Sequence, residues 1–323
     1  MGNYTNRDID IFILSYNRGQ FLLETIRCLL NQSIGAIEMT VLDNYSIGET
    51  AEMVSKIDDE RVKVIINKEN IGGLNNIKKA QDLSSKEWTI IFHDDDLIHP
   101  KYIEEVLKIL NSNSEITIVA ALTELNEFPH ESKWKDTKLS KVLIYKNAGQ
   151  FAKELFKGLP VPFCSIVYKT KLLKKAKLNQ ELYGKIADRP FLFDCINGGE
   201  IAVLKNVFIQ SRVHIDRDSN DFLTGPFENQ WILLVKKYYD IMGDSIFTTS
   251  GRTFLNRGTR TLLVTMNPHI YDDIGKKNYI ALAIEKGAIS KFGYFMGLPY
   301  YYTYIFAKKI QGITKQIMQF DRK

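Results

Sequence analysis

The fold is decided by the stretch Trp88-Thr89-Ile90-Ile91-Phe92-His93-Asp94-Asp95-Asp96. Its first five residues form an apolar run, which predicts a strand buried inside a sheet. Three aspartates stand where this strand leaves the sheet, and carboxylates so close together repel one another unless they bind protons or a cation. A divalent metal carrying a phosphorylated ligand would satisfy them, because hard cations prefer oxygen ligands. An acidic loop that caps the following helix is the alternative interpretation.

Short apolar runs alternate with helix-like segments on both sides of this stretch. Leu22, Ile26, Leu29 and Leu30 repeat at the spacing of one helix face. This alternation predicts an α/β fold with a mainly parallel, doubly wound, Rossmann-like sheet. The predicted strands are 9–14, 37–42, 61–66, 88–92 and 116–122, and the predicted helices are 22–30, 49–57, 73–83 and 103–110.

The regular alternation stops after residue 122. Residues 124–141 are polar and charged and are expected to form a loop or a sheet edge. Beyond them the pattern predicts helices at 147–157 and 188–196, an apolar segment at 163–168, and strands at 201–209 and 211–215. From residue 222 the segments look helical, with one apolar stripe formed by Phe227, Trp231, Leu234, Val235, Tyr238 and Met242.

Polar side chains follow each of the first four predicted strands. Asn17 and Arg18 come after the first strand, Asp43 and Asn44 after the second, and Asn70 after the third. The aspartate triplet follows the fourth. Ligands of doubly wound sheets bind beyond the carboxyl ends of the strands, so these side chains are expected to converge on one site.

In order and spacing, these motifs resemble an inverting family 2 glycosyltransferase of the GT-A fold, of the type that builds bacterial surface polysaccharides. The resemblance covers residues 8–215. The matching pieces are Ser15-Tyr16-Asn17-Arg18, Val41-Leu42-Asp43-Asn44, Asn70-Ile71-Gly72-Gly73, Phe92-His93-Asp94-Asp95-Asp96-Leu97-Ile98-His99-Pro100, Asp188 before a helix, and Arg212-Val213-His214.

The resemblance implies a role for each matched residue. Asp43 would accept a hydrogen bond from the nucleotide base, and Asp94 and Asp95 would lie near the ribose and the sugar. Asp96 would bind the divalent metal on the diphosphate, and Asp188 would be the general base. The other implied ligand-binding residues are Ser15, Tyr16, Asn17, Arg18, Asn44, Asn70 and Gly72 on the nucleotide, with Arg212 and His214 facing the diphosphate or the metal.

The chemistry implied by the resemblance is a single displacement. Mg²⁺ or Mn²⁺ on Asp96 would offset the charge that grows on the departing diphosphate. Asp188 would take the proton of an acceptor hydroxyl, an effect typically worth about 10²–10⁴-fold in rate. The anomeric centre would be inverted without a covalent intermediate.

Two positions depart from the family pattern. Ala187 stands before Asp188, where the family often has Glu, so Asp194 is a rival for the base. His93 stands where the family often has Asp, and it could contact the ligand or serve only the structure. Structural roles remain open for Asp188, as a helix cap, and for the pair Arg212 and His214, as braces of the sheet.

Composition limits the other classes of function. The 323 residues carry a net charge of +5, of which residues 275–323 contribute nine Lys or Arg against two Asp or Glu, or +7. The rest of the chain is therefore close to neutral, at −2, which does not indicate nucleic-acid binding. Three cysteines without paired or metal-type spacing and a polar start at residues 1–10 indicate a cytoplasmic protein without a signal peptide.

The basic end of the chain suggests a further partner. Residues 292–307 hold five tyrosines and no charge, and lysines flank them. This pattern favours a membrane surface, on the inner face of the cell membrane, as the partner of residues 292–323, because aromatic residues with flanking cations suit the interface. Packing on the protein itself or on a second copy is the alternative. We expect a catalytic domain at 1–216, with a nucleotide-sugar half at 1–122 and an acceptor half at 123–216, followed by a helical region at 217–323.

Three other functions compete with the transferase. A sugar-nucleotide nucleotidyltransferase would need a loop rich in glycine and Lys or Arg after the first strand, where the chain has Tyr16-Asn17-Arg18-Gly19. A Rossmann dehydrogenase would need Gly-x-Gly-x-x-Gly there. A degenerate transferase acting as a scaffold or glycan-binding protein is disfavoured by the intact acidic residues. The expected partners are a nucleotide-sugar donor and a glycan or polyprenyl-linked acceptor, and a homo-oligomer is compatible with the sequence.

Overall fold

The computed structural model describes residues 2–35, 37–126, 134, 141–156, 159–196, 198–214 and 228–242. The chain divides into two compact units, Met1–Arg217 and Asp218–Lys323. The predicted site residues lie in the first unit. The expected interfacial segment at 292–323, and the helical character expected beyond residue 242, lie outside the described residues.

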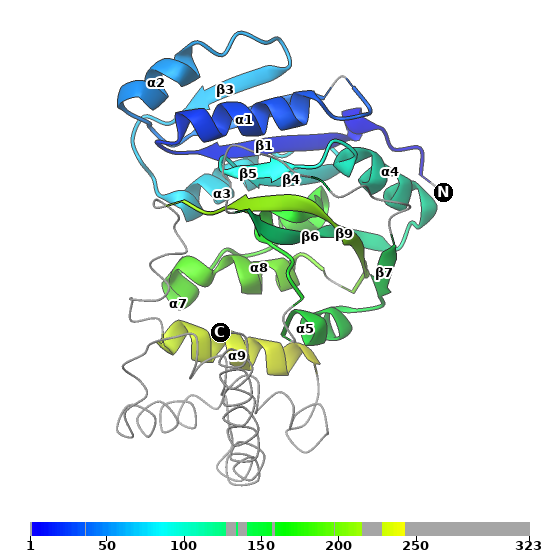
Figure 1. Cartoon of the computed structure of the whole chain (residues 1–323). Coiled ribbons are helices and arrows are strands. Elements are labelled where there is room, and N and C mark those ends of the chain that lie inside the picture. Colours follow the sequence, from blue (N-terminus) through cyan, green and yellow to red (C-terminus); the bar gives the residue numbers. More distant parts are fainter. Residues whose placement is uncertain are drawn as a thin grey trace, which may run out of the picture. The chain divides into compact units, whose positions relative to one another are not determined.

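The first unit is built on one mixed sheet with helices packed against it (Figure 1). Along the sheet the strand order is β3-β2-β1-β4-β8-β6-β9-β5, and β7 pairs with β9. This arrangement confirms the predicted α/β class. The strands are β1 (Ile9–Ser15), β2 (Met39–Asp43), β3 (Val62–Ile66), β4 (Trp88–His93), β5 (Asp96–Ile98), β6 (Ile116–Asn126), β7 (Val142–Tyr145), β8 (Ile166–Lys169) and β9 (Glu200–Arg212).

The helices join these strands or follow them. In Figure 1, α1 runs alongside β1, and it contacts both α2 and β5. The helical elements of the first unit are η1 (Asn6–Asp8), α1 (Gly19–Leu30), α2 (Gly48–Ser55), α3 (Gly73–Leu83), α4 (Tyr102–Ser112), α5 (Ala148–Phe156), η2 (Phe163–Ser165), α6 (Thr170–Leu173), α7 (Gln180–Tyr183), η3 (Gly184–Ile186) and α8 (Asp188–Asp194).

The described part of the second unit is helix α9 (Glu228–Met242). Leu234 and Tyr238, two members of the expected apolar stripe, are buried. They are four residues apart and therefore lie on the same face of the helix. No helix in the described ranges has both the length and the apolar character that crossing a bilayer requires.

The parallel half of the sheet brings the predicted polar residues to one edge. In the register of β1 with β2, Ser15 lies beside Asp43, and in that of β2 with β3, Asp43 lies beside Ile66. β1 also pairs with β4 so that Leu14 lies beside His93. The turns after these four strands therefore start at the same level, as the sequence predicted from the carboxyl ends of parallel strands.

The other half of the sheet contains antiparallel pairs that the sequence pattern did not predict. β8 lies between β4 and β6 and is antiparallel to both, and β5 and β7 are antiparallel to β9. The two strands predicted at 201–209 and 211–215 form one strand, β9, which ends at Arg212. Gln210 interrupts the apolar pattern, but its buried side chain donates a hydrogen bond to Glu124 on the neighbouring strand (2.8 Å), so β9 continues through it.

The core lies between the sheet and its helices. Trp88 of β4 and Leu22, Ile26 and Leu29 of α1 belong to it, and each is at most 5% exposed. Burying one such side chain contributes about 1.5–3 kcal/mol to folding. This packing holds α1 against the strand ends, so that the turn before α1 has a fixed position beside the acidic triplet.

Candidate functional site

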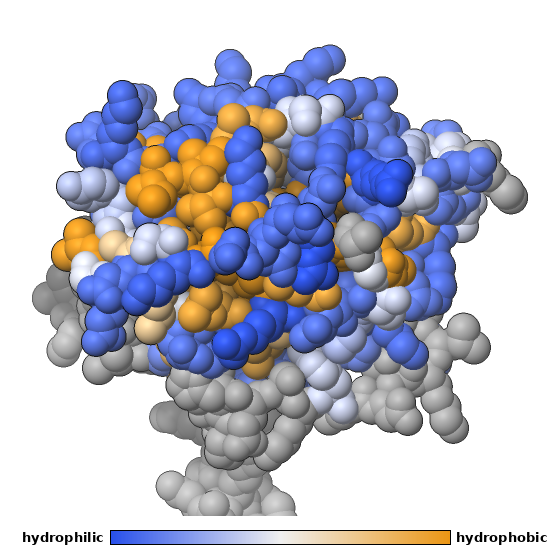
Figure 2. All heavy atoms as spheres, turned by 90° about the horizontal axis from the view of Figure 1, so that it is seen from above, coloured by the Kyte–Doolittle hydropathy of each residue, from blue (hydrophilic) through white to orange (hydrophobic). Residues whose placement is uncertain are grey.

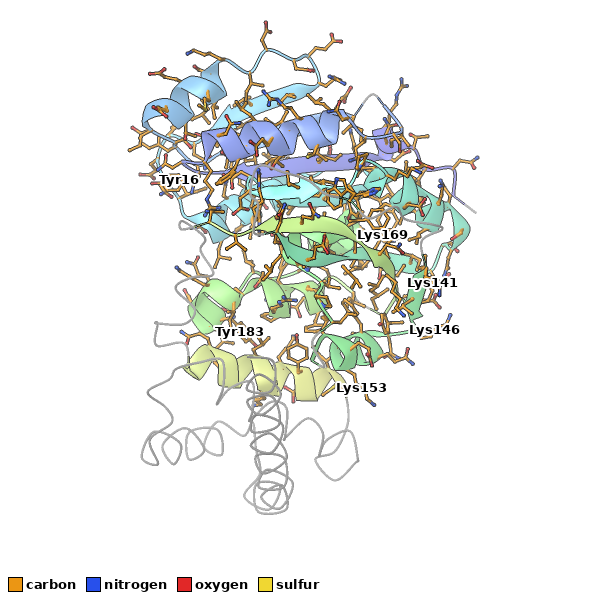
Figure 3. All side chains as sticks on the ribbon, viewed as in Figure 1. Tyr16, Lys141, Lys146, Lys153, Lys169 and Tyr183 are labelled. Carbon is orange, nitrogen blue, oxygen red and sulfur yellow. The ribbon has the colours of Figure 1, made fainter. Side chains whose placement is uncertain are left out.

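The site lies at the carboxyl edge of the parallel strands. Figure 3 shows Tyr16, which follows β1, at one side of the first unit and Lys169 at the other. Lys169 pairs with Trp88 at the start of β4, so it marks the opposite edge of the sheet. Figure 2 shows apolar atoms interrupting a hydrophilic surface. The exposed large hydrophobic side chains include Tyr16, Tyr45, Ile47 and Ile66, on or beside the turns after β1, β2 and β3.

The turns after β1 and β2 are hydrogen-bonded to each other. The Asn17 amide N–H donates to Ser46 Oγ (2.9 Å), and Ile47 N–H donates to Asn17 Oδ1 (2.9 Å). Asn17 and Tyr45 both have positive φ, at 54° and 65°. Asparagine tolerates this conformation, but for tyrosine it is uncommon and persists only where neighbouring structure imposes it. The two turns therefore form one rigid wall.

Asp43 is buried behind this wall at the end of β2. One carboxylate oxygen accepts from the Ser46 amide (2.9 Å) and the other from the Ser46 hydroxyl (2.6 Å). At 1% exposure it is held in a fixed orientation. Its contact with a nucleotide base stays a prediction, and the unused lone pairs of the carboxylate are what such a contact would use.

Ser46→Ala tests whether this orientation matters. The change removes the hydroxyl that Asp43 and Asn17 share, and each lost hydrogen bond costs about 1–3 kcal/mol when it leaves a buried partner unsatisfied. We expect a lower unfolding temperature and an affinity for the nucleotide that falls about fivefold or more, measured by calorimetry. Ser55→Ala, at an exposed hydroxyl on α2, is the control and should change neither quantity. An affinity unchanged in Ser46→Ala would show that the Ser46 hydroxyl is not needed to orient Asp43 for nucleotide binding.

An amide network attaches a third turn to the other two. Asn44 Nδ2 donates to Asn70 Oδ1 (2.8 Å), and Asn44 Oδ1 accepts from the Ile71 amide (3.0 Å). Asn67 Nδ2 donates to Asn44 Oδ1 (2.9 Å) and to Asn76 Oδ1 (3.2 Å). Asn70 Oδ1 also accepts from the Gly72 amide (2.9 Å), just before α3 begins. The predicted residues Asn44, Asn70 and Gly72 are therefore brought together, and their amides build the turn.

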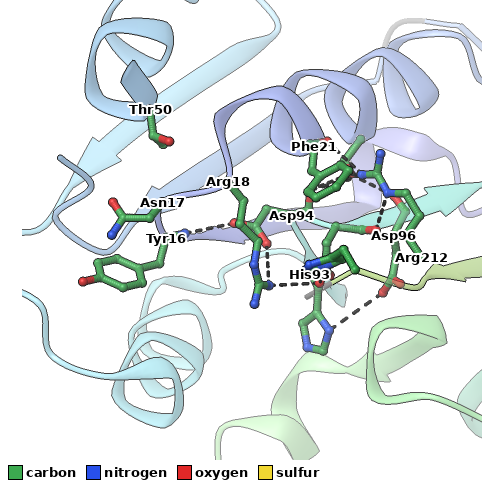
Figure 4. A network of polar contacts seen from close by, with 12 residues as sticks. Tyr16, Asn17, Arg18, Phe21, Thr50, His93, Asp94, Asp96 and Arg212 are labelled. Carbon is green, nitrogen blue, oxygen red and sulfur yellow. Dashed lines mark hydrogen bonds and ion pairs between the residues drawn. The ribbon is translucent and has the colours of Figure 1, made fainter. Parts of the chain in front are cut away.

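The acidic triplet lies beside the first of these turns (Figure 4). Asp94 Oδ2 accepts from the Tyr16 amide (2.9 Å), and Arg18 Nη1 lies 3.3 Å from Asp94 Oδ1 and 2.9 Å from Asp95 Oδ2. Arg18 is thus an ion-pair partner of both carboxylates. The Ser15 hydroxyl is buried, and no hydrogen bond is formed by it within the described part of the chain.

The three carboxyl groups differ in their electrostatic environments. Burial, together with the charge of Asp95, raises the pKa of Asp94 to about 7. Burial and Asp95 also raise the pKa of Asp96. Burial acts in the same direction on Asp95, but His93, Arg18 and His214 outweigh it and hold the pKa of Asp95 below its ordinary value. Asp95 is therefore the carboxyl group that most readily carries a negative charge, and Asp94 and Asp96 are the two that gain most from an added cation.

Arg212 has other partners than the diphosphate that the resemblance implies. Its guanidinium is buried and forms an ion pair with Glu24 of α1. Nη2 donates to the Phe21 carbonyl (3.0 Å) and to Thr25 Oγ1 (3.2 Å), Nε donates to the Asp95 carbonyl, and the cation lies over the Phe21 ring. The Thr25 hydroxyl in turn donates to the carbonyls of Asp94 (3.0 Å) and Asp96 (2.8 Å). Arg212 thus ties the backbone of the triplet to α1.

The two histidines near the triplet serve different carboxylates. His214 Nε2 lies 3.0 Å from Asp95 Oδ2, with its ring against Phe21. His93 Nδ1 lies 3.8 Å from Asp96 Oδ2, and its ring stacks on Phe163. The structure therefore brings His93 to the predicted metal ligand Asp96 and brings His214 to Asp95.

Asp188 is the first residue of α8 and is half-buried. Burial raises its pKa, and Arg189 and His93 act in the opposite direction. Because His93 influences Asp188 as well as the triplet, the predicted base and the predicted metal ligand share one electrostatic environment. Asp194 ends the same helix, two turns away, and its side chain is exposed. The geometry favours Asp188 over its rival.

Sequence reasoning missed four residues of the site. Ser46, Glu24 and Thr25 hold the predicted residues in place, and the Cys164 sulfur lies within 4.8 Å of a carboxylate oxygen of Asp96. Each is of a type that is common in turns, on helix surfaces or in cores, so its identity alone carries no functional signal. Only the fold brings them to the site.

Comparison with known protein families matches residues 10–176 to "Glycosyl transferase family 2", which is more than half of the chain. The chain belongs to glycosyl transferase family 2. The match includes the first three turns, the acidic triplet and Cys164, and it ends before Asp188 and Arg212.

Three glycosyltransferases are distantly similar in sequence to this chain. An uncharacterized glycosyltransferase of Haemophilus influenzae is 28% identical over 120 residues, which are 36% of this chain and 37% of that protein. An uncharacterized glycosyltransferase of Methanocaldococcus jannaschii is 24% identical over 219 residues, 64% of this chain and 70% of that protein. The putative glycosyltransferase EpsH of Bacillus subtilis is 23% identical over 217 residues, which cover 64% and 61% of the two chains.

Solved structures of TarS share the fold. TarS 1–349 of S. aureus in complex with UDP has a TM-score of 0.61 and 17% identity, covering 88% of this chain and 82% of TarS 1–349. The same fragment in complex with UDP-GlcNAc has a TM-score of 0.59 and 15% identity, covering 86% and 80%. These similarities confirm the predicted GT-A fold.

Proposed function

We propose that the protein is an inverting glycosyltransferase that moves a sugar from a nucleotide diphosphate to a hydroxyl group of a glycan or lipid-linked acceptor. A UDP-sugar is the proposed donor, in keeping with the UDP and UDP-GlcNAc complexes of the structurally similar TarS. The observation that carries the proposal is the half-buried carboxylate of Asp188, which shares the neighbour His93 with the acidic triplet.

The nucleotide would bind against the three interlocked turns. We assign the base to the wall that the turns after β1 and β2 form, next to Asn17, Ser46 and the buried Asp43. Tyr16, which is 43% exposed, is available at the edge of this wall. We assign the ribose and the sugar to the region of Asp94 and Asp95, where Arg18 forms ion pairs with both carboxylates. In this proposal residues 1–122 form the nucleotide-sugar half of the catalytic domain and residues 123–216 form the acceptor half.

The residues present fit a divalent cation beside Asp96. The ligand atoms of His93, Asp96 and Cys164 all lie within 4.8 Å of one another. When bound, such an ion would act as a Lewis acid that offsets the negative charge developing on the diphosphate. The resemblance gave His214 a share of this role, but His214 contacts Asp95, and we propose that it orients that carboxylate.

Asp188 would act on the acceptor. Its carboxylate accepts the proton of the acceptor hydroxyl while that oxygen bonds to the anomeric carbon and the bond from this carbon to the diphosphate oxygen breaks. Burial raises the pKa of Asp188 above that of an exposed carboxyl group. The Asp188 carboxylate therefore takes up the proton of the acceptor more readily than an exposed carboxylate would. One displacement of this kind inverts the anomeric centre.

Calorimetric titration of UDP, dTDP and GDP, each with and without Mn²⁺, tests the donor class. We expect metal-dependent binding of UDP, and we expect Asp96→Ala to abolish the metal dependence because it removes the carboxylate ligand. Asp82→Ala, at an exposed acid on α3, is the matched control and should bind as the unchanged protein does. If a folded protein bound none of the three nucleotides, the transferase proposal would fail in favour of a degenerate scaffold.

The biological setting is proposed from the sequence and from the family resemblance that its motifs carry. Synthesis of a surface polysaccharide such as O-antigen or capsule, with a polyprenyl-linked acceptor, suits an enzyme held at a membrane surface by residues 292–323. Flotation with anionic vesicles tests this attachment, and a chain ending at residue 291 should no longer float. A shortened chain that floats as before would exclude the segment as the membrane-binding element.

A further inference from the structure

Three potential metal ligands of different chemistry lie close together in the first unit. His93 ends β4, Asp96 begins β5, and Cys164 lies in η2 before β8. Their imidazole, carboxylate and thiol atoms all lie within 4.8 Å of one another. His93 Nδ1 is 3.8 Å from Asp96 Oδ2. One nitrogen, one oxygen and one sulfur atom therefore surround a single point.

The surroundings suit the entry of an ion. Asp96 and Cys164 are buried, at 3% and 1% exposure, while the His93 side chain is 43% exposed and forms the open side of the group. Phe163 stacks on the imidazole, with an interplanar angle of 18°, and limits its rotation. Two donors on one zinc ion lie at most about 4.4 Å apart, because zinc–ligand bonds are about 2.0–2.3 Å long. The three ligand atoms, all within 4.8 Å of one another, lie close to that range.

The donor set selects among divalent ions. Mg²⁺ prefers oxygen ligands, whereas imidazole and thiolate favour Co²⁺ and Zn²⁺, which also stand above Mn²⁺ in the general order of affinity. We propose that His93, Asp96 and Cys164 together bind a divalent cation, and that they prefer Zn²⁺ and Co²⁺ to Mn²⁺ and Mn²⁺ to Mg²⁺. Binding converts the thiol to a thiolate and releases its proton to the solvent.

This preference for Zn²⁺ and Co²⁺ would come from particular residues of this chain, and the transferase reaction itself does not require it. The inference rests on the proposed function only in that the same Asp96 would carry the ion used with the nucleotide. The His93 imidazole and the Cys164 thiol supply the discrimination, because a carboxylate alone accepts any of the four ions. The inference is therefore tested with metal ions alone, without nucleotide or sugar.

The first experiment is calorimetric titration of the full chain with ZnCl₂, CoCl₂, MnCl₂ and MgCl₂. We expect one site that binds Zn²⁺ and Co²⁺ at least about tenfold more tightly than Mg²⁺. His93→Asp replaces nitrogen by oxygen and should reduce this preference about tenfold, whereas His99→Gln, at a buried histidine that accepts from the Lys101 amide, should leave it unchanged. Equal affinities for Mg²⁺ and Co²⁺ in the unchanged protein would overturn the inference.

The second experiment identifies the sulfur ligand. Co²⁺ bound to a thiolate gives a ligand-to-metal charge-transfer band, which we expect in the unchanged protein and in Cys195→Ser, a control at another buried cysteine. Cys164→Ser should lose the band and weaken Co²⁺ binding while retaining Mg²⁺ binding. A band that persists in Cys164→Ser would exclude Cys164 as a ligand. Thermal unfolding of each variant confirms that it is folded before titration.

The two proposals fail in different ways. Selective Co²⁺ and Zn²⁺ binding without any nucleotide binding would leave the metal site standing and remove the transferase proposal. If the free ions bound with equal affinities and transfer from a UDP-sugar proceeded as well with Mg²⁺ as with the other ions, the selectivity proposal would fail. The transferase proposal would then stand.

Discussion

Asp188→Asn is expected to lower kcat by about 10²–10⁴-fold and to leave the affinity for the donor nucleotide nearly unchanged. The amide has the size of the carboxyl group but cannot take a proton from the acceptor hydroxyl. Because Asp188 lies on α8 and not on the three turns assigned to the nucleotide, donor binding should not depend on its charge. Transfer is measured as product formed from a UDP-sugar, and donor affinity by calorimetry on the same sample.

The pH dependence of transfer gives an independent check on Asp188. Burial raises its pKa above the ordinary value of 3.8, and only the deprotonated carboxylate acts as a base. Activity should therefore fall as the pH is lowered, with a midpoint above 3.8, and Asp188→Asn should lose this acidic limb. Asp194→Asn, on the same helix, is the control. A large loss in Asp194→Asn with normal transfer in Asp188→Asn would reverse the assignment of the base.

Arg212→Met is expected to destabilise the protein by about 3–5 kcal/mol, because removing one partner of a buried ion pair leaves the other charge uncompensated. Methionine keeps much of the apolar stem, so the loss reports on the guanidinium. That group pairs with Glu24 and donates to the carbonyls of Phe21 and Asp95. The free energy of unfolding is measured by chemical denaturation of both proteins.

Two comparisons distinguish the loss of the ion pair between Arg212 and Glu24 from a general effect of removing a positive charge. Arg61→Met breaks a partly exposed ion pair with Asp59 and should have little effect. In Glu24→Gln, the further change Arg212→Met should cost less than it does in the unchanged protein, because the two residues act as one unit. Additive effects of Glu24→Gln and Arg212→Met would show that their ion pair does not stabilise the fold.

The parallel half of the fold follows from local sequence, whereas the other half does not. Each of the first four strands is an apolar run followed by a turn and a helix, and that order implies parallel pairing and a common edge. The antiparallel pairs of β8, β5 and β7 join segments far apart in the chain, for which periodicity contains no information about the partner. β5 has three residues, too few to show any period.

The candidate site was predictable as a set of positions but not as a set of contacts. The sequence placed Asn17, Asp43, Asn70 and the acidic triplet at one edge, and the register of the strands brings them there. It could not show that Arg212 contacts Glu24 and Phe21 of α1, because these residues lie far from it in the sequence and only the fold brings them together. Nor could it join Cys164 to Asp96, which lie 68 positions apart.

The hydrogen bonds that join the turns after β1, β2 and β3 have a consequence for the thermodynamics of donor binding. Asn17, Ser46, Asn44 and Asn70 order these turns when the chain folds, so their conformational entropy is already lost before a nucleotide arrives. Binding then requires little further ordering of the protein on that side, and more of the interaction energy remains as affinity. The donor half of the site should accordingly behave as a preformed receptor, with nearly the same backbone in its free and bound states.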